Sequence, residues 1–412
     1  MPSFSTSLSG LDSESQALSV ISNNLANLNT VGYKSASPEF QDLFYQQIGS
    51  AGDGNPIQVG VGATVGSIPA TFTQGSIEST GVPTDVAIQG NGFFVLDKNG
   101  LRSYTRAGDF SVGSNGQLLT ADGSAVLGYP AVNGTISASQ TLAPLTISSG
   151  QLSPPQATAN VQIGLNLDAS AAVGGTFSTP VTVYDSLGGT HVLTFNFTKT
   201  AANTWSYAID IPAADVGTTG SPVSVGSGTL TFNGNGQLTS PTGNVTGITV
   251  SGLADGASNL TFNWDLYGSN NSPIVTQASS ASAAASTQQD GYSSGTLASF
   301  NIQGDGTIQG IFSNGQTLAL GQLALATFAN QQGLVRNGSN EFLASLSSGT
   351  ANIGTPNTGG RGTLAGGSLE QSNVDIATEF AQLILAERGY QANSRVVTTI
   401  DQVIQDAINM SQ

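Results

Sequence analysis

The sequence of 412 residues contains no cysteine. This absence excludes disulfide bonds, thiolate metal sites and thiol nucleophiles. It also suits a protein that crosses between compartments, because no thiol is present to be trapped by oxidation. Whatever stabilises the fold must therefore come from packing, hydrogen bonds and the few charges that the chain carries.

Charged residues are scarce in this sequence, and basic residues are scarcer than acidic ones. Only 8% of the residues are charged, against about a quarter in ordinary globular proteins. The 25 acidic and 9 basic side chains give a net charge of −16, and Lys199 is the only Lys or Arg between Thr146 and Ala285. Nucleic-acid binding needs clustered Lys and Arg to displace counterions, so a nucleic-acid partner is excluded.

Long hydrophobic runs are also missing. The most apolar stretch, "LALGQLALATFA" at 318–329, is interrupted by Gly, Gln and Thr and is too short to span a bilayer. The start, "MPSFSTSLSGL", has neither the basic nor the apolar region of a secretory signal. We therefore expect neither membrane insertion nor conventional secretion.

Helical periodicity is present at both ends of the chain. Near the start, leucines and other apolar residues recur every three, four or seven positions up to the natural stop at Gly32, beside a face of uncharged asparagines. From Leu369 onward a heptad pattern predicts a second, longer helix. The predicted stripe residues are Phe4, Leu8, Leu11, Leu18, Ile21, Leu25, Leu28, Leu369, Ile376, Phe380, Leu383, Tyr390, Val397, Ile404 and Ile408.

The middle of the chain is typical of β-structure. The 53 glycines and the recurring Asn-Gly and Asp-Gly pairs indicate many tight turns between short strands. Composition shifts predict an N-terminal helix (1–32), an extended connection (33–75), an inner β-domain in two parts (76–145 and 286–360), an inserted outer β-domain (146–285) and a C-terminal helix (361–412). The predicted fold is mainly β with α-helical termini, which form a coiled-coil core beside two barrel-like or sandwich-like domains.

The two terminal stripes most simply pair with each other, since nothing between them is helical. The C-terminal stripe is longer, so such a pair leaves apolar surface for other copies of the chain. We therefore interpret the stripe residues as a subunit interface. The alternative is that both helices pack only on their own domain. The basic residues Lys34, Arg361, Arg388 and Arg395 are either inter-subunit partners or solvated charges.

Candidate catalytic and metal-binding residues are few. His191, the only histidine, lies in a strand-like run and is typical of a surface or hydrogen-bonded residue. Ser293 in "GYSSG" matches a nucleophile-elbow pattern, but that arrangement needs a histidine downstream. Asp53, Asp255, Asp290 and Asp305 lie in Asp-Gly turns without the spacing of a calcium loop. We expect no enzyme activity, cofactor or metal; glycoside hydrolysis is a weaker alternative.

Three stretches resemble the rod and hook family of bacterial flagellar axial proteins. They are "SGLDSESQALSVISNNLANLNTVGYKS", the segment from "DVAIQGNGFFVL" to "AVLGYP", and "SLEQSNVDIATEFAQLILAERGYQANSRVVTTIDQVIQDAINM". The size of the 146–285 insertion is most similar to hook-type members. The resemblance implies a subunit that self-assembles into a flexible tube, a universal joint that passes motor torque from rod to filament. A distal rod-type protein, or less simply an extracellular adhesin, is the alternative.

The same resemblance implies partners and a location. The partners are further copies of the chain, the distal rod protein, the hook cap protein, the hook-filament junction protein, the hook-length control protein and the flagellar type III export apparatus. The implied location is extracellular, in the hook attached to the basal body.

Overall fold

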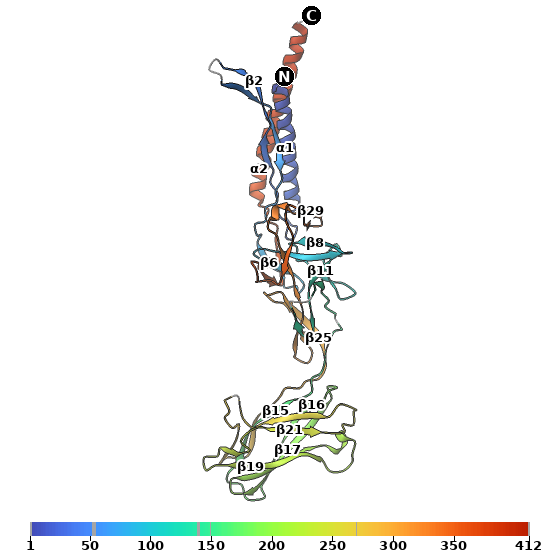
Figure 1. The fold of residues 1–412 in the computed structure, drawn as a ribbon, viewed down its shortest axis with the longest axis vertical. Coiled ribbons are helices and arrows are strands. Elements are labelled where there is room, and N and C mark those ends of the chain that lie inside the picture. The colour runs from blue at the N-terminus through green and yellow to red at the C-terminus, as the bar shows by residue number, and fades with distance from the viewer. Residues whose placement is uncertain (1, 52–54, 138–140, 149, 269, 411–412) are drawn as a thin grey trace. The chain divides into compact units, whose positions relative to one another are not determined.

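A computed structural model of the chain describes residues 2–51, 55–137, 141–148, 150–268 and 270–410. Two compact units are present (Figure 1): unit 1 is Met1–Ser148, Ser299–Gly310 and Thr317–Gln412, and unit 2 is Ser149–Ala298 and Ile311–Gln316. The change from one unit to the other falls within strands β25 (Gly295–Ile302) and β26 (Thr307–Phe312). The predicted fold class, mainly β with helical termini and one β-domain inserted in another, is confirmed, with sandwich-like sheets rather than closed barrels.

The two helices of unit 1 are α1 (Pro2–Ala26) and α2 (Ile376–Met410). They lie side by side and antiparallel (Figure 1), with Asn24 against Glu379 and Gly10 against Asn393. Because α2 has 35 residues and α1 has 25, the C-terminal end of α2 extends past α1. The predicted pairing of the termini is therefore confirmed.

The helix bounds differ from the predicted ones at both inner ends. Leu28 lies in a turn after α1, and Leu369 lies in strand β33 (Ser368–Glu370), not in a helix. The Oδ1 of Asp375 accepts a hydrogen bond from the Thr378 backbone N–H at 2.7 Å, which caps α2 and makes it begin at Ile376. The apolar residue Leu369 fell at helical spacing from the residues of α2 by chance, because it belongs to a strand before the cap.

The segment between α1 and the β-structure folds into two nested pairs of strands. The outer pair is β1 (Glu39–Asp42) with β4 (Ala63–Ser67), and the inner pair is β2 (Tyr45–Ser50) with β3 (Pro56–Gly60). The start of β4 lies against α1, since Ser13 Oγ donates to the Ala63 backbone oxygen at 3.1 Å. The predicted connection is thus more regular than its weak sequence signals indicated. The predicted turn at Asp53 lies outside the described residues.

The β-body of unit 1 is built around one sheet. Its path runs β27-β11-β7-β8-β30-β29, and Phe93, Tyr104, Phe328 and Phe342 pack in its core. The other strands of unit 1 pair at its margins or with each other. The strands are β5 (Ile77–Ser79), β6 (Val86–Gln89), β7 (Phe93–Lys98), β8 (Leu101–Thr105), β9 (Ser111–Val112), β10 (Leu118–Leu119), β11 (Ala125–Val132), β12 (Thr135–Ile136), β13 (Ala143–Pro144), β27 (Thr317–Leu323), β28 (Leu325–Thr327), β29 (Val335–Gly338), β30 (Glu341–Leu343), β31 (Asn352–Gly354) and β32 (Thr363–Gly366), with the short helix η2 (Gln331–Gly333).

Unit 2 packs two sheets on one hydrophobic core. One sheet runs β16-β17-β18-β19-β20, and the other runs β21-β22-β15-β23 with β24 beside β15. Alternating residues of both sheets, among them Phe195, Tyr207 and Trp264, are buried together, as period-two strands require. The elements are β14 (Leu152–Ser153), β15 (Asn160–Asp168), β16 (Thr176–Tyr184), β17 (Thr190–Ala201), β18 (Thr204–Ile211), η1 (Ala213–Val216), β19 (Val223–Phe232), β20 (Leu238–Ser240), β21 (Val245–Val250), β22 (Leu260–Asp265), β23 (Val275–Ala278) and β24 (Ala283–Gln289).

Candidate assembly surface

The seam between α1 and α2 is made by two alanines and three larger apolar residues. Ala17, Ile21 and Ala386 are buried there, and Leu18 and Leu383 are partly buried against them. A Cβ atom at Gly389 would lie 2.6 Å from Glu14 Oε1, so the Glu14 side chain of α1 lies against α2 at this glycine. The pair therefore closes with few of the large apolar side chains that the helices carry.

The predicted interface residues divide into three groups in the structure. Leu18, Ile21 and Leu383 lie in the intrachain seam. Leu11, Leu25, Leu28, Leu369, Val397 and Ile404 are half-buried. Phe4, Leu8, Ile376, Phe380, Tyr390 and Ile408 are exposed. A single heptad stripe thus describes neither the seam nor the exposed surface.

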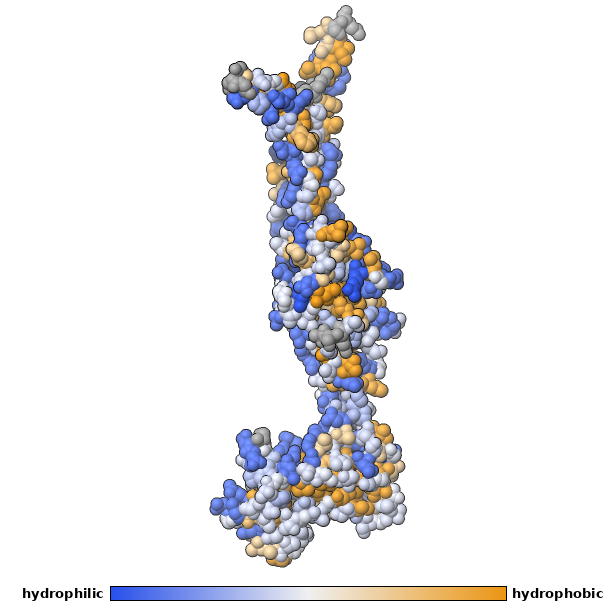
Figure 2. Space-filling model, in the orientation of Figure 1, coloured by the Kyte–Doolittle hydropathy of each residue, from blue (hydrophilic) through white to orange (hydrophobic). Residues whose placement is uncertain are grey.

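We use the name outer apolar face for all exposed large residues of the two helices, which lie on more than one side of α2. Part of this surface is visible at the free end of α2 (Figure 2). Val396, Val403 and Met410 are spaced by seven residues and therefore share one side of α2. The i, i+7 spacing from Val396 was the signal in the sequence for these positions, which the predicted stripe omitted. The face consists of Phe4, Leu8, Ile376, Phe380, Ile384, Leu385, Tyr390, Val396, Val403, Ile408 and Met410.

The nested strands add further apolar surface to unit 1. Phe44, between β1 and β2, has 91% of its side chain exposed, and Tyr45 and Ile48 of β2 are also exposed. Isolated apolar residues on a surface are normal, but contiguous groups mark sites of association. Sequence reasoning missed these residues because the 33–75 region lacks a clear period.

At the base of the helices lies a group that we call the buried charge cluster: Lys34, Arg106 and Glu370. Lys34 Nζ lies 2.6 Å from Glu370 Oε1, and Arg106 Nε donates to Glu370 Oε2 at 3.0 Å. Burial lowers the pKa of Lys34, and its hydrogen bond with Glu370 opposes that shift. Lys34 is thus neither solvated nor free for another subunit, contrary to both sequence interpretations.

Local backbone geometry places Lys34 in this cluster. Gly32 ends the turn after α1 with a φ of 64°, and its N–H donates to the Glu370 backbone oxygen at 2.7 Å. A Cβ atom at Gly32 would lie 2.7 Å from the Ala107 backbone nitrogen, so only glycine fits. The cluster thereby joins the end of α1, the end of β8 and the strand that leads into α2.

The asparagines of α1 also hold this region together. Asn24 Nδ2 donates to the Ala36 backbone oxygen at 2.7 Å and to Glu379 Oε1 at 3.0 Å, and its Oδ1 accepts from the Ala36 N–H. Burial raises the pKa of Glu379; the hydrogen bond from Asn24 lowers it, and the charge of Asp375 raises it. Through Asn24, the uncharged amide face thus bonds α1 to α2 and to the segment that follows α1.

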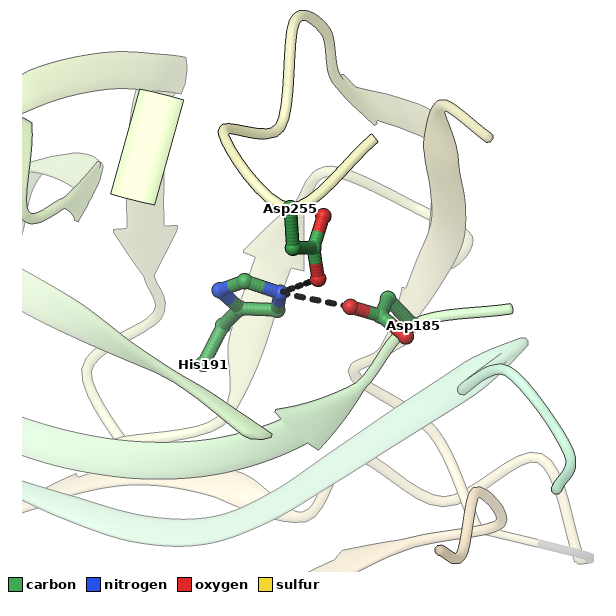
Figure 3. A group of neighbouring side chains, drawn as sticks. All are labelled: Asp185, His191 and Asp255. Carbon is green, nitrogen blue, oxygen red and sulfur yellow. Dashed lines mark hydrogen bonds and ion pairs between the residues drawn. The ribbon is translucent and has the colours of Figure 1, made fainter. Parts of the chain in front are cut away.

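Unit 2 contains a separate group, the His191 cluster: Asp185, His191, Asp215 and Asp255. His191 Nε2 lies 2.9 Å from Asp185 Oδ2 and 3.8 Å from Asp255 Oδ2 (Figure 3), and Nδ1 lies 3.1 Å from Asp215 Oδ2. Burial by itself lowers the pKa of His191, but its hydrogen bonds to Asp185 and Asp215 raise the pKa above the usual value. His191 is buried and hydrogen-bonded, one of the two environments expected from sequence.

Neither helix among the described residues has a stretch long and apolar enough to cross a membrane.

Comparisons with known families first define the class. Residues 4–34 match the family model described as "Flagella basal body rod protein", and residues 365–410 match "Flagellar basal body rod FlgEFG protein C-terminal". Residues 87–166 match "Flagellar hook protein FlgE/F/G D1 domain", and residues 151–292 match "Flagellar basal body protein FlaE D2 domain". Paired terminal helices around such domains define an axial protein of the flagellar rod and hook class.

Full-length relatives narrow the class. The chain is 38% identical to "Flagellar hook protein FlgE" of Salmonella typhimurium, over 99% of this chain and 100% of the relative. It is 35% identical to the hook protein FlgE of Treponema pallidum, over 100% of both chains. The chain belongs to the flagellar hook protein family and is a structural subunit of the hook type. These relatives support the hook-type interpretation of the sequence over the rod-type and adhesin alternatives.

A solved structure supports the fold. The crystal structure of the Helicobacter pylori flagellar hook protein FlgE2 matches with a TM-score of 0.50 at 16% identity, over 70% of this chain and 98% of that chain. At 16% identity this match supports a shared fold and no further property.

Proposed function

We propose that copies of this hook-family chain assemble through their terminal helices into a flexible tube that transmits torque from motor to filament. The observation that carries the proposal is the outer apolar face, whose large side chains are left exposed by the pairing of α1 with α2. Full burial of one such side chain contributes about 1.5–3 kcal/mol, so neighbouring copies gain much by covering the face. The predicted interface residues that lie in this face are therefore proposed as inter-subunit contacts.

The intrachain seam and the outer apolar face have different proposed roles. Ile21 and Leu383 in the seam hold the helix pair of one chain together. Phe380 and Ile384, which are exposed beside the seam, contact neighbouring chains. We therefore revise the predicted interface: seam residues act on assembly only indirectly, by presenting the exposed ones.

The parts of the chain have distinct proposed places in the tube. The terminal segments 1–32 and 361–412, which contain α1 and α2, form its core. The inner β-domain (76–145 and 286–360) forms the wall, and the insertion 146–285 forms the outer surface. The segment 33–75 connects core and wall. Hinges are proposed in the glycine-containing stretches 31–75 and 144–156, which would let the β-domains move as the tube bends. The third predicted stretch, 276–292, instead contains most of β23 and β24, which pair with β15 inside unit 2.

The low charge of the chain suits a joint that bends at each rotation. Exposed ion pairs contribute little, typically 0–1 kcal/mol, whereas amide and hydroxyl partners are easily exchanged. We propose mechanical work without catalysis, outside the cell, after export through the flagellar type III apparatus. Contacts with the distal rod, hook cap, hook-filament junction and hook-length control proteins belong to the same proposal.

Electron microscopy of the purified, polymerised protein tests the proposed function. We expect curved tubes that survive deletion of residues 150–292, because the helical core is intact in that variant. Straight rods would favour a rod-type role. Loss of all assembly on removing the insertion, with the remaining unit folded, would contradict assembly through the helices.

A further inference from the structure

The His191 cluster lies outside the proposed assembly surface and has no role in it. Asp185 directly follows the strand β16, His191 lies at the start of β17, and Asp255 lies in the turn between β21 and β22. We propose that Asp185, His191 and Asp255 bind a divalent transition-metal cation, with Zn²⁺ as its representative. Asp215 acts as a positioning residue for the imidazole.

The spacing of the donor atoms fits one cation. In a tetrahedral zinc site with metal–ligand distances near 2.0–2.2 Å, neighbouring ligand atoms lie about 3.3–3.6 Å apart. The Nε2 of His191 lies 2.9 Å from Asp185 Oδ2 and 3.8 Å from Asp255 Oδ2, on either side of that range. All three donor atoms lie within 4.8 Å of one another (Figure 3). Imidazole nitrogen and carboxylate oxygen are both ligands that Zn²⁺ takes in proteins.

The protein itself orients these donors. Asp185 Oδ1 accepts hydrogen bonds from the backbone N–H groups of Leu187 and Gly189, which leaves Oδ2 directed at His191. Asp255 Oδ1 likewise accepts from the Ala257 N–H, so its Oδ2 is available. Nδ1 of His191 faces the Asp215 carboxylate, the arrangement that fixes ring orientation in histidine metal sites.

A glycine keeps open the space between the two carboxylates. A Cβ atom at Gly189 would lie 2.5 Å from Asp185 Oδ2 and 3.0 Å from Asp255 Oδ2. The turn does not demand this glycine, because Gly188 takes the left-handed conformation (φ 85°) and Gly189 does not. What Gly189 provides is room beside the carboxylate oxygens, at the place where a cation would sit.

Charge balance favours a cation as well. Residues 149–298 contain seven Asp, no Glu, one Lys and one His. Three of these aspartates gather at His191, while Lys199 Nζ donates to the backbone oxygens of Ala169 and Ala171 instead. A divalent cation replaces the proton on Nε2 and neutralises more of the carboxylate charge than that proton does.

The bound cation would join the two sheets of unit 2. Asp185 and His191 belong to the β16-β17 sheet, and Asp255 lies in the turn between β21 and β22 of the other sheet. In a chain without cysteine, such a cross-link takes the place that a disulfide has in other extracellular β-domains. It would stabilise unit 2 against forced opening.

Isothermal titration of the untagged, chelator-treated full-length protein with ZnCl₂ tests the proposal. We expect one equivalent to bind, and we expect Asp255→Asn to weaken binding at least tenfold. That variant keeps the bonds of His191 to Asp185 and Asp215, and its Oδ1 still accepts from Ala257, so the fold is retained. Asp265→Asn, an aspartate of the same unit outside the cluster, is the matched control and should bind as the parent does.

The imidazole gives a direct readout, because His191 is the only histidine of the chain. With ¹⁵N-labelled histidine, Zn²⁺ should shift the Nε2 resonance in the parent and in Asp265→Asn, and Gly189→Val should abolish the shift by filling the space. Absence of stoichiometric binding, equal binding by Asp255→Asn, or binding without a change at His191 would each overturn the proposal.

Discussion

Lys34 and Glu370 are separated by most of the chain, yet Lys34 Nζ lies 2.6 Å from Glu370 Oε1 and both side chains are fully buried. The second oxygen of Glu370 binds Arg106. Two cations therefore share one carboxylate at the point where the helix pair meets the β-body of unit 1. Buried ion pairs contribute little net stability, but removing one partner is strongly destabilising. The pair thus specifies how the ends of the chain are joined.

Glu370→Gln should destabilise unit 1 by about 3–5 kcal/mol, because Lys34 and Arg106 then stay buried without their counter-charge. Chemical denaturation measures the loss, and limited proteolysis should release the terminal segments earlier than in the parent. Glu78→Gln is the control: Glu78 is exposed and accepts from Gln371 Nε2, so its change should stay within about 0.5 kcal/mol. Equal effects of the two changes would refute the importance of the cluster.

Phe380→Asp should block polymerisation and leave the monomer folded, because Phe380 is 46% exposed and belongs to the outer apolar face. In a polymer the new carboxylate would be buried without a partner, which costs on the order of several kcal/mol of assembly free energy. Sedimentation and circular dichroism separate the two effects. Gln382→Asp, an exposed polar position nearby, should still polymerise.

Leu383→Asp should act differently from Phe380→Asp, although the two residues are less than one helical turn apart. Leu383 packs against the seam formed by Ala17, Ile21 and Ala386. A charge there should separate α1 from α2 and lower the helix content of the monomer itself. If Leu383→Asp left the monomer intact and Phe380→Asp unfolded it, the assignment of the two sides of α2 would be reversed.

Deletion of residues 376–412 should abolish polymerisation and leave both β-bodies folded. The cut is placed after Asp375, because a deletion from Leu369 would also remove Glu370 and leave Lys34 and Arg106 unpaired. Electron microscopy and thermal unfolding provide the two readouts. Tubes formed by the truncated chain would disprove assembly through α2.

Glu379→Gln should stabilise the helix pair at neutral pH. Burial raises the folded-state pKa of Glu379 above its usual 4.5, despite the hydrogen bond from Asn24. A raised pKa means that the contribution of Glu379 is complete below about 4.5 and is lost as the pH rises through the folded-state value. The variant lacks this loss. The midpoint of its thermal unfolding should therefore exceed that of the parent at pH 7 and match it in acid. A constant difference across this range would exclude titration of Glu379 as the cause.

The terminal helices show what a periodic apolar pattern in the sequence can predict and what it cannot. Spacing predicted that both ends are helical and that they pair, because a stripe of apolar residues must be covered and no other helix is available. Spacing did not predict which residues meet. The seam buries Ala17, Ile21 and Ala386, with Leu18 and Leu383 packed against them. It leaves Phe380 and Ile384 exposed.

The charged residues show where sequence reasoning stops. Lys34, His191 and Asp255 each had an ordinary local interpretation, because their partners lie in other strands and turns. Arg106 and Glu370 lie in stretches that resemble the rod and hook family, but neither was singled out as a charged partner. No local signal could have found either cluster.

By itself the sequence determined the helical ends, the β-rich middle, the inserted domain and the family, because periodicity, turn residues and motifs are properties of neighbouring positions. Tertiary structure alone decided which helix side is covered, which charges share a buried carboxylate and which aspartates surround His191. These are contacts between distant segments, and their energies depend on burial and distance, which only the folded chain defines.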